Sequence, residues 1–243
     1  MTRAHSAFNK LYWVRDNIIA SDFPDISSAL KEPEGLLAIG GDLSPERLIN
    51  AYRRGIFPWY SEGQPIMWWS PDPRWILVPD GLKISRSLRR TLHKRRFHIT
   101  FNHDFPNVIS KCAEPRKDSS DTWITTDVMQ SYKILHDQGH AHSVECWYEG
   151  KLVGGLYGIV IGKIFFGESM FSRMHDASKV ALIHLSMQLK QWNFRLIDCQ
   201  VYSKHLESLG AMPIPRTIFA NLLKQFCIPD FKYKWPQDSV FIT

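Results

Sequence analysis

A short apolar segment, RLIDCQVY at residues 195–202, carries two polar side chains at alternate positions. Successive side chains of a β-strand point to opposite faces, so Asp198 and Gln200 are expected on one face with α-carbons about 7 Å apart. An unpaired carboxylate is costly to bury in an apolar strand. Asp198 therefore needs a partner or a polar cleft, and the alternative is a structural Asp at a sheet end that accepts backbone N–H bonds. The strand pattern leaves both alternatives open.

A second carboxylate, Glu168, lies in the apolar segment FFGESMFS at residues 165–172. If this strand runs on, Phe166, Glu168 and Met170 share a face, and the carboxylate could bind a cationic group in a pocket. The alternative is a Glu that caps the next helix, because Glu is common at helix starts.

Motifs for nucleotides and metals are missing. The chain has no GxGxxG, and Gly40-Gly41 lacks the Lys-Ser/Thr of a phosphate loop. His136, His140 and His142 invite a zinc interpretation, but Gly139 breaks their helical register and no Cys or carboxylate completes the set. We expect no metal and no cofactor, so an acyl group moved by this chain would have to arrive already activated.

Basic residues are concentrated in one window. The net charge is +6, and no acidic residue lies between Asp80 and Asp104. The segment SRSLRRTLHKRR within it predicts a helix capped by Ser85, with a narrow apolar stripe and a broad cationic face. This face suits a polyphosphate partner, whose phosphates it would bind without recognising the nucleotide sequence. A solvated cationic surface is the simpler alternative. The cations of the window are Lys83, Arg86, Arg89, Arg90, Lys94, Arg95 and Arg96.

The elements around these residues follow from periodicity and turn residues. Ser44 and Pro45 predict the start of a helix that Gly55 ends. An aromatic, proline-rich connector follows over residues 57–77, with a domain boundary near Pro73. Further helices are predicted over 127–137, 177–192 and 205–209, and strands over 142–148, 152–161, 164–169 and 195–202. Hairpin strands followed by a long helix, a strand and another helix indicate an α+β fold with a mixed sheet.

Composition sets the broad class. With 243 residues, 44% of them hydrophobic, the chain can bury a core of its own. Its four scattered cysteines suit reduced thiols rather than disulfides. No signal peptide or membrane-spanning run is present, so we expect a soluble cytoplasmic protein with no membrane partner.

Several longer motifs together resemble the leucyl/phenylalanyl-tRNA–protein transferase family. The stretch GLLAIGGDLSPERLINAYRRGIFPWYSEGQPIMWWSPDPRWIL is similar to the N-terminal signature of that family. TWIT, HAHSVECW, LVGGLYG, FFGESMFSR, ASK, LIDCQV and SLGA…IPR follow in the family's order. The resemblance covers residues 23–219.

The resemblance implies a small N-terminal α/β domain (1–73) and a GNAT-like, that is acetyltransferase-like, catalytic domain (74–243). It also implies transfer of Leu or Phe, and less readily Met, from aminoacyl-tRNA to proteins that begin with Arg or Lys, which marks them for degradation. Aminoacyl-tRNA and acceptor proteins are the expected partners, and we expect a monomer.

Site residues are implied by the same resemblance. Asp198 and Gln200 would be the catalytic pair, and we favour Asp198 as proton acceptor because an amide is almost non-basic. Trp59 and Trp123 would stack on the 3′-terminal adenosine. Glu168 would help to place the basic residue of the acceptor or the terminal nucleoside. The apolar pocket for the transferred side chain would be lined by Leu156, Phe165, Leu182, Leu185, Leu189 and Ile197.

Two competing functions are weighed against this one. An acetyl-CoA-dependent N-acetyltransferase would need a glycine-rich pyrophosphate loop before the long helix, where this chain has SRMHDASK. A non-catalytic tRNA-binding protein would explain the basic helix and the tryptophans but not the Asp198/Gln200 pair.

Overall fold

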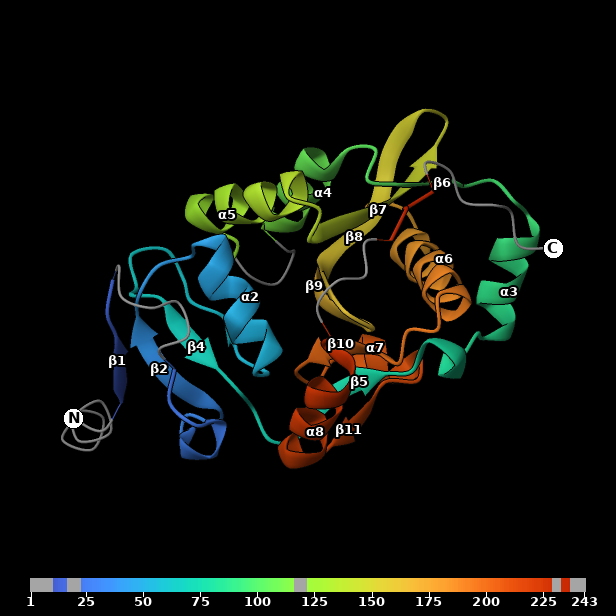
Figure 1. The fold of residues 1–243 in the computed structure, drawn as a ribbon. Helices are drawn as coiled ribbons and strands as arrows, with labels where there is room; N and C mark the ends of the chain where they lie inside the picture. The colour runs from blue at the N-terminus through green and yellow to red at the C-terminus, as the bar shows by residue number, and fades with distance from the viewer. Residues whose placement is uncertain (1–10, 17–22, 116–121, 229–232, 237–243) are drawn as a thin grey trace.

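Two sheets, one small and one large, organise the molecule (Figure 1). The computed structural model describes residues 11–16, 23–115, 122–228 and 233–236. The small sheet has the strand order β1-β2-β4-β3. Its strands are β1 (Tyr12–Val14), β2 (Leu36–Gly40), β3 (Phe57–Pro58) and β4 (Met67–Trp69).

The large sheet has the order β11-β5-β10-β9-β8-β7-β6. Only its β9–β10 pair is parallel among the described strands; its other pairs are antiparallel. The expected α+β class with a mixed sheet is therefore confirmed. The strands are β5 (Arg74–Leu77), β6 (His98–Phe101), β7 (Ala141–Tyr148), β8 (Lys151–Ile161), β9 (Ile164–Ser172), β10 (Leu196–Gln200) and β11 (Met212–Ile214).

Helices cover both faces of the large sheet. In Figure 1, α6 (Ala177–Gln191) lies on one side of β7–β9, and α4 (Phe105–Ala113) and α5 (Thr126–Asp137) lie on the other. The remaining helices are α2 (Pro45–Arg53), α3 (Arg86–His93), α7 (Lys204–Ser208), α8 (Arg216–Phe226) and two 3₁₀ turns, η1 (Ile26–Ser28) and η2 (Pro79–Gly81).

Alternating side chains of the central strands feed two hydrophobic clusters. Leu156 and Phe165 point into the cluster beneath α6, whereas Tyr157 and Phe166 point into the cluster shared with α4, α5 and α2. The second of these clusters also contains residues of the small sheet, such as Trp68. The small sheet therefore packs onto the same core as one face of the large sheet.

Most predicted elements are present, with local corrections. Ser44 occupies the N-cap position of α2, but its side chain makes no capping hydrogen bond; Asp42 Oδ1 instead accepts from the Ser44 N–H at 2.9 Å. Ser85 does cap α3, with its hydroxyl accepting from the Leu88 N–H at 3.2 Å. The aromatic connector is not a plain linker, because it forms β3, β4 and β5. The domain boundary at residue 73 stays a prediction.

Candidate active site

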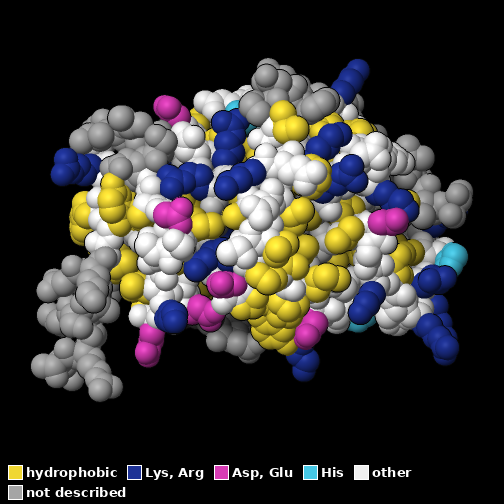
Figure 2. Space-filling model, turned by 60° about the horizontal axis from the view of Figure 1, so that its bottom comes forward, with side chains coloured by type: hydrophobic (Ala, Val, Ile, Leu, Met, Phe, Trp, Pro, Cys, Tyr) yellow, Lys and Arg dark blue, Asp and Glu magenta, His cyan; other side chains and the backbone are white. Residues whose placement is uncertain are grey.

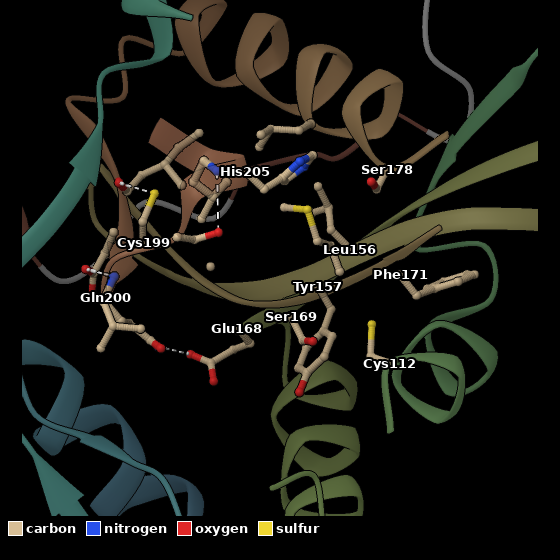
Figure 3. Close-up of a pocket in the computed structure, with 18 of the residues that line it drawn as sticks. Cys112, Leu156, Tyr157, Glu168, Ser169, Phe171, Ser178, Cys199, Gln200 and His205 are labelled. Carbon is tan, nitrogen blue, oxygen red and sulfur yellow. Dashed lines mark hydrogen bonds between the residues drawn. The ribbon is translucent and has the colours of Figure 1, made fainter. Parts of the chain in front are cut away.

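A cavity of about 850 Å³ opens between β8, β9, β10 and α6, with β3 at its edge. Figure 3 shows Gln200 and Glu168 on one side of it, and Tyr157, Ser169 and Cys112 on another. Asp198, Gln200 and Glu168 all line it. The residues predicted for chemistry from two separate segments are thus brought together.

The strand that carries Asp198 ends earlier than predicted. β10 stops at Gln200 rather than Tyr202, and its register against β5 shifts between Asp198 and Gln200. Gln200 has φ +64°, a left-handed conformation that is rare outside glycine and typical of functional sites in non-glycine residues. Its N–H donates to Asp198 Oδ1 at 2.9 Å. A bulge therefore aims the Gln200 side chain, and regular alternation through residue 202 is wrong.

Asp198 is fully buried and held by an arginine. Arg74 Nε donates to Asp198 Oδ1 at 2.8 Å, and Arg74 Nη2 donates to Oδ2 at 2.6 Å. Both side chains are almost inaccessible, at 1% and 0%. A buried, bidentate pair of this geometry, together with the bond from the Gln200 N–H, leaves the two carboxylate oxygens little capacity for a further partner. These contacts suit a positioning role better than that of a proton acceptor.

Glu168 is the carboxylate that faces the cavity with several donors around it. It does not cap a helix, because it lies within β9 and the next helix starts at Ala177. Tyr52 Oη donates to Glu168 Oε1 at 2.7 Å, Gln200 Nε2 donates to the same oxygen at 2.9 Å, and Tyr132 Oη donates to Oε2 at 3.0 Å. Figure 3 shows the Gln200–Glu168 bond as a dashed line.

The surroundings of Glu168 change its acidity. Burial raises its pKa from 4.5 to about 7, and the nearby charge of Asp198 also raises it. The hydrogen bonds from Tyr52, Tyr132 and Gln200 act in the opposite direction. A carboxyl group with a pKa close to neutral is matched to proton transfer at cellular pH.

The apolar part of the cavity contains five of the six predicted lining residues. These are Leu156, Phe165, Leu182, Leu185 and Ile197, joined by residues not predicted, among them Leu77, Met170 and Leu206. The sixth, Leu189, is not among the described lining residues. It lies one turn beyond Leu185 on the same helix face. There it is fully buried in the hydrophobic cluster beneath α6.

Both predicted tryptophans reach the cavity. Trp59 is 44% exposed, and its ring lies 5.7 Å from that of Trp69. Trp123 also lines the cavity and is partly exposed. Partly exposed aromatic rings at a cavity mouth can stack on a planar group.

The seven predicted cations are all exposed, and α3 lies on the outer side of α6 (Figure 1). Among the described residues, none of the seven lines the cavity. In Figure 2, hydrophobic side chains gather near the centre of the face, and Lys and Arg side chains flank them, several on the side where Figure 1 places α3. This charge distribution is the kind that attracts a polyanion extending away from the cavity.

The histidines of the predicted cluster are engaged in protein contacts. His136 Nδ1 lies 2.8 Å from the Ala141 carbonyl, and the His136 ring stacks on Phe105. His142 Nε2 lies 3.1 Å from the Gly139 carbonyl. In the described part of the chain, no cluster of three or more His, Cys, Asp or Glu side chains suits a metal ion. Nor is any helix of that part long and apolar enough to cross a membrane.

Three side chains that contact Asp198 or Glu168 were not predicted: Arg74, Tyr52 and Tyr132. The tyrosines have the sequence context of core aromatics, and both are fully buried. A cation directly before the apolar run WIL was the available signal for Arg74, because a buried arginine needs an anionic partner.

Comparison with known proteins gives a consistent family. The family profile "Leucyl/phenylalanyl-tRNA protein transferase" matches residues 76–224, and the profile of its N-terminal domain matches residues 41–72. A leucyl/phenylalanyl-tRNA–protein transferase of Aromatoleum aromaticum is 59% identical over 82% of this chain and 84% of its own length. One of Nitrosomonas europaea is 54% identical over 90% of this chain and 93% of its own.

Solved structures align at much lower similarity. L-PGS from Bacillus licheniformis aligns at 14% identity and a TM-score of 0.39, over 75% of this chain and 58% of that one. A GCN5-related N-acetyltransferase from Kribbella flavida aligns at 9% identity and a TM-score of 0.33, over 70% of this chain and 60% of that one.

Proposed function

The chain belongs to the leucyl/phenylalanyl-tRNA–protein transferase family of aminoacyltransferases, and we propose which groups it joins and where. It moves Leu or Phe, and less readily Met, from aminoacyl-tRNA to the α-amino group of cytoplasmic proteins that begin with Arg or Lys. The product then carries a bulky apolar N-terminal residue that marks it for degradation. The observation that supports this best is the Glu168–Gln200–Asp198 array beside an apolar cavity.

The reaction needs little beyond placement and one proton acceptor. The amine nitrogen of the acceptor attacks the ester carbonyl carbon, an amide bond forms, and the ester C–O bond to the tRNA ribose breaks. The attacking nitrogen loses a proton, and the ribose oxygen leaves as a hydroxyl group. An α-amino group has a pKa of about 7.7–8.0 and the ester is already activated, so holding the two reactants together supplies much of the acceleration.

Glu168, rather than Asp198, accepts the proton of the amine in this scheme. Its pKa of about 7 keeps a useful fraction of the carboxylate charged at neutral pH, and it lies on the cavity surface. Asp198 is committed to Arg74 and to the Gln200 N–H. From the sequence we favoured Asp198 as the base. In the scheme proposed here, Asp198 instead orients Gln200, and Gln200 orients Glu168.

The apolar cavity takes the transferred side chain, and the partly exposed tryptophans take the terminal adenosine. Leucine and phenylalanine side chains suit walls made by Leu156, Leu182 and Ile197, which discriminate by size and shape. A carboxylate at the cavity also favours an acceptor whose first residue is cationic. The cations of α3 hold phosphates of the tRNA without reading sequence.

Acetyl-CoA fits the same fold poorly. A pyrophosphate would have to bind backbone N–H groups at the start of α6. The buried carboxylate of Asp176 lies there instead, accepting from Lys179 Nζ at 2.9 Å and Thr91 Oγ1 at 3.0 Å. The start of α6 is thus occupied by a carboxylate already paired within the chain, and not by a cradle of free donors for a diphosphate.

The test is transfer of label to a peptide that begins with Arg. The purified chain is incubated with the peptide and with radiolabelled Leu-tRNA, Phe-tRNA or acetyl-CoA in separate reactions. We expect labelled peptide from both aminoacyl-tRNAs and none from acetyl-CoA. Label from acetyl-CoA, or tRNA binding without any transfer, would contradict the proposal.

A matched acceptor series tests the finer specificity. Peptides that differ only in the first residue, Arg, Lys, Ala or Glu, are compared at equal concentration. Faster transfer to Arg and Lys is expected, and equal transfer to the Glu peptide would remove the proposed preference for basic acceptors.

A further inference from the structure

Arg74 is a buried cation whose three hydrogen-bonding nitrogens have different tasks. Nε and Nη2 hold both oxygens of Asp198, and Nη1 donates to the Gly55 carbonyl at 3.1 Å. The guanidinium lies between two rings, 4.7 Å from the centroids of both Phe57 and Phe219. Such a guanidinium is fixed in position by the acceptors in its plane and by two aromatic faces.

These contacts come from three distant parts of the chain. Gly55 lies in the turn between α2 and β3, Phe57 is the first residue of β3, and Phe219 belongs to α8 near the C-terminal end of the chain. Gly55 has φ +76°, and a Cβ there would lie 3.1 Å from Leu223 and 3.2 Å from Phe219. The turn is thus packed tightly against α8, which keeps the Gly55 carbonyl and the Phe57 ring in place around Arg74.

A chain of contacts leads from Arg74 to the cavity. Asp198 Oδ1 accepts from Arg74 Nε and also from the Gln200 N–H, at 2.8 and 2.9 Å. The second bond closes the left-handed turn of Gln200, whose side-chain amide then donates to Glu168. Rotation of the Asp198 carboxylate would therefore release the backbone conformation that aims the amide.

We propose that Arg74 is a positioning residue for aminoacyl transfer: it fixes Asp198, and through Asp198 the Gln200 bulge, against the Gly55–Phe57 turn and α8. This inference rests on the proposed function. Through Arg74, the geometry at the cavity depends on the segment from Gly55 to Phe57 and on α8. Neither of these supplies the reacting carboxylate.

The first experiment compares Arg74→Lys with a matched control. Lysine keeps the charge but has one nitrogen, so it cannot hold both oxygens of Asp198 and the Gly55 carbonyl in one plane. Arg47→Lys is the control, because Arg47 is as buried as Arg74 and pairs with Asp42 at 3.1 Å in the small-sheet region. Single-turnover transfer from saturating Phe-tRNA and the Kd for Phe-tRNA are measured for the wild type and both variants.

We expect Arg74→Lys to slow transfer at least about tenfold, because small misplacements of reacting groups are costly. The Kd for Phe-tRNA should stay within about twofold, since Arg74 lies outside the predicted tRNA contacts. Arg47→Lys should transfer at the wild-type rate. A wild-type rate for Arg74→Lys, or a loss that appears only in the Kd, would overturn the proposal. A wild type that transfers no label at all would instead refute the proposed function.

A double-variant cycle separates positioning from a general loss of structure. Arg74 does not touch the Gln200 side chain, so independent effects would multiply. If Arg74 acts by aiming Gln200, then adding Arg74→Lys to Gln200→Ala should slow transfer less than about twofold further. A double variant whose loss of rate equals the product of the two single-variant losses would overturn the proposal.

A milder variant covers the case in which Arg74→Lys does not fold. Phe219→Leu loosens one side of the guanidinium and leaves the ion pair with Asp198 intact. It should slow transfer several-fold at an unchanged Kd, and an unchanged rate in a folded Phe219→Leu protein would count against Arg74.

Discussion

The substitution Glu168→Gln should slow aminoacyl transfer and at the same time stabilise the folded protein. Glutamine has nearly the shape of glutamate and keeps one oxygen that can accept from Tyr52 Oη and Gln200 Nε2, with its amide nitrogen facing Tyr132 Oη, but it cannot take a proton from an amine. The two consequences follow from one property, which is the raised pKa of the carboxyl group.

The effect on stability follows from linkage. The pKa of Glu168 is about 7 in the folded protein and 4.5 ordinarily, so the folded state binds the proton more tightly. The stabilisation by this proton is complete below pH 4.5 and is lost as the pH rises through about 7. At pH 8 the charged Glu168 costs the folded state about 3 kcal/mol, at about 1.4 kcal/mol per pKa unit. For a chain of this size, removing that cost should raise the Tm by up to about 10 °C.

The effect on rate has the opposite sign. Transfer by the wild type should rise with pH through about 7 as Glu168 loses its proton. The glutamine variant should lose this rise and keep only the titration of the acceptor amine, with a rate lower by about a hundredfold. The assays are single-turnover transfer from Phe-tRNA between pH 5.5 and 9, and thermal unfolding at pH 5 and pH 8.

Either of two results would refute this reasoning. One is a glutamine variant with the wild-type rate and the wild-type pH profile. The other is a Tm difference that is the same at pH 5 and pH 8, because a pKa that is raised on folding must make the difference grow with pH.

Three further predictions concern tRNA binding, the apolar cavity and the sheet. Arg90→Ala should weaken Leu-tRNA binding and reduce the slope of log Kd against log salt concentration by about one unit. The control Lys151→Ala, on the β7–β8 hairpin, should change neither. Equal slopes for the two variants would reject α3 as a phosphate contact. Leu156→Phe should lower kcat/KM for Phe-tRNA about tenfold more than for Leu-tRNA, since it narrows the cavity. An unchanged ratio of the two kcat/KM values would mean that the transferred side chain binds elsewhere. Gly158→Ala should cost about 1–3 kcal/mol in urea unfolding because its Cβ would lie 2.2 Å from a β9 carbonyl, and Gly81→Ala, with ordinary contacts at 3.6 Å, serves as the control.

The sequence predicts well what local chemistry determines. Ser85 followed by an apolar stripe specifies α3, and the turn residues at Glu149-Gly150 and Gly162 place β7, β8 and β9. The family motifs also bring Asp198, Gln200 and Glu168 to one cavity. The helix and the two hairpins depend on residues close together in the chain, whereas the meeting of Gln200 with Glu168, 32 positions apart, was expected from the family resemblance.

Long-range pairing is what periodicity could not supply. Arg74 and Asp198 are 124 positions apart, and Tyr52 and Glu168 are 116 positions apart, so no spacing rule joins them. The bulge at Gln200 was also missed, because it arises from the Asp198 side chain accepting a backbone N–H and not from a glycine. These long-range contacts are the basis of our proposal that Glu168, rather than Asp198, accepts the proton.

The mass of an Arg-starting peptide after incubation with the chain and Phe-tRNA shows whether an aminoacyl group is transferred. We expect a gain of one phenylalanine residue on the α-amino group, fast with the wild type and strongly slowed with Glu168→Gln. A peptide of unchanged mass, or an equal gain with an acetyl-blocked N-terminus, would contradict this expectation.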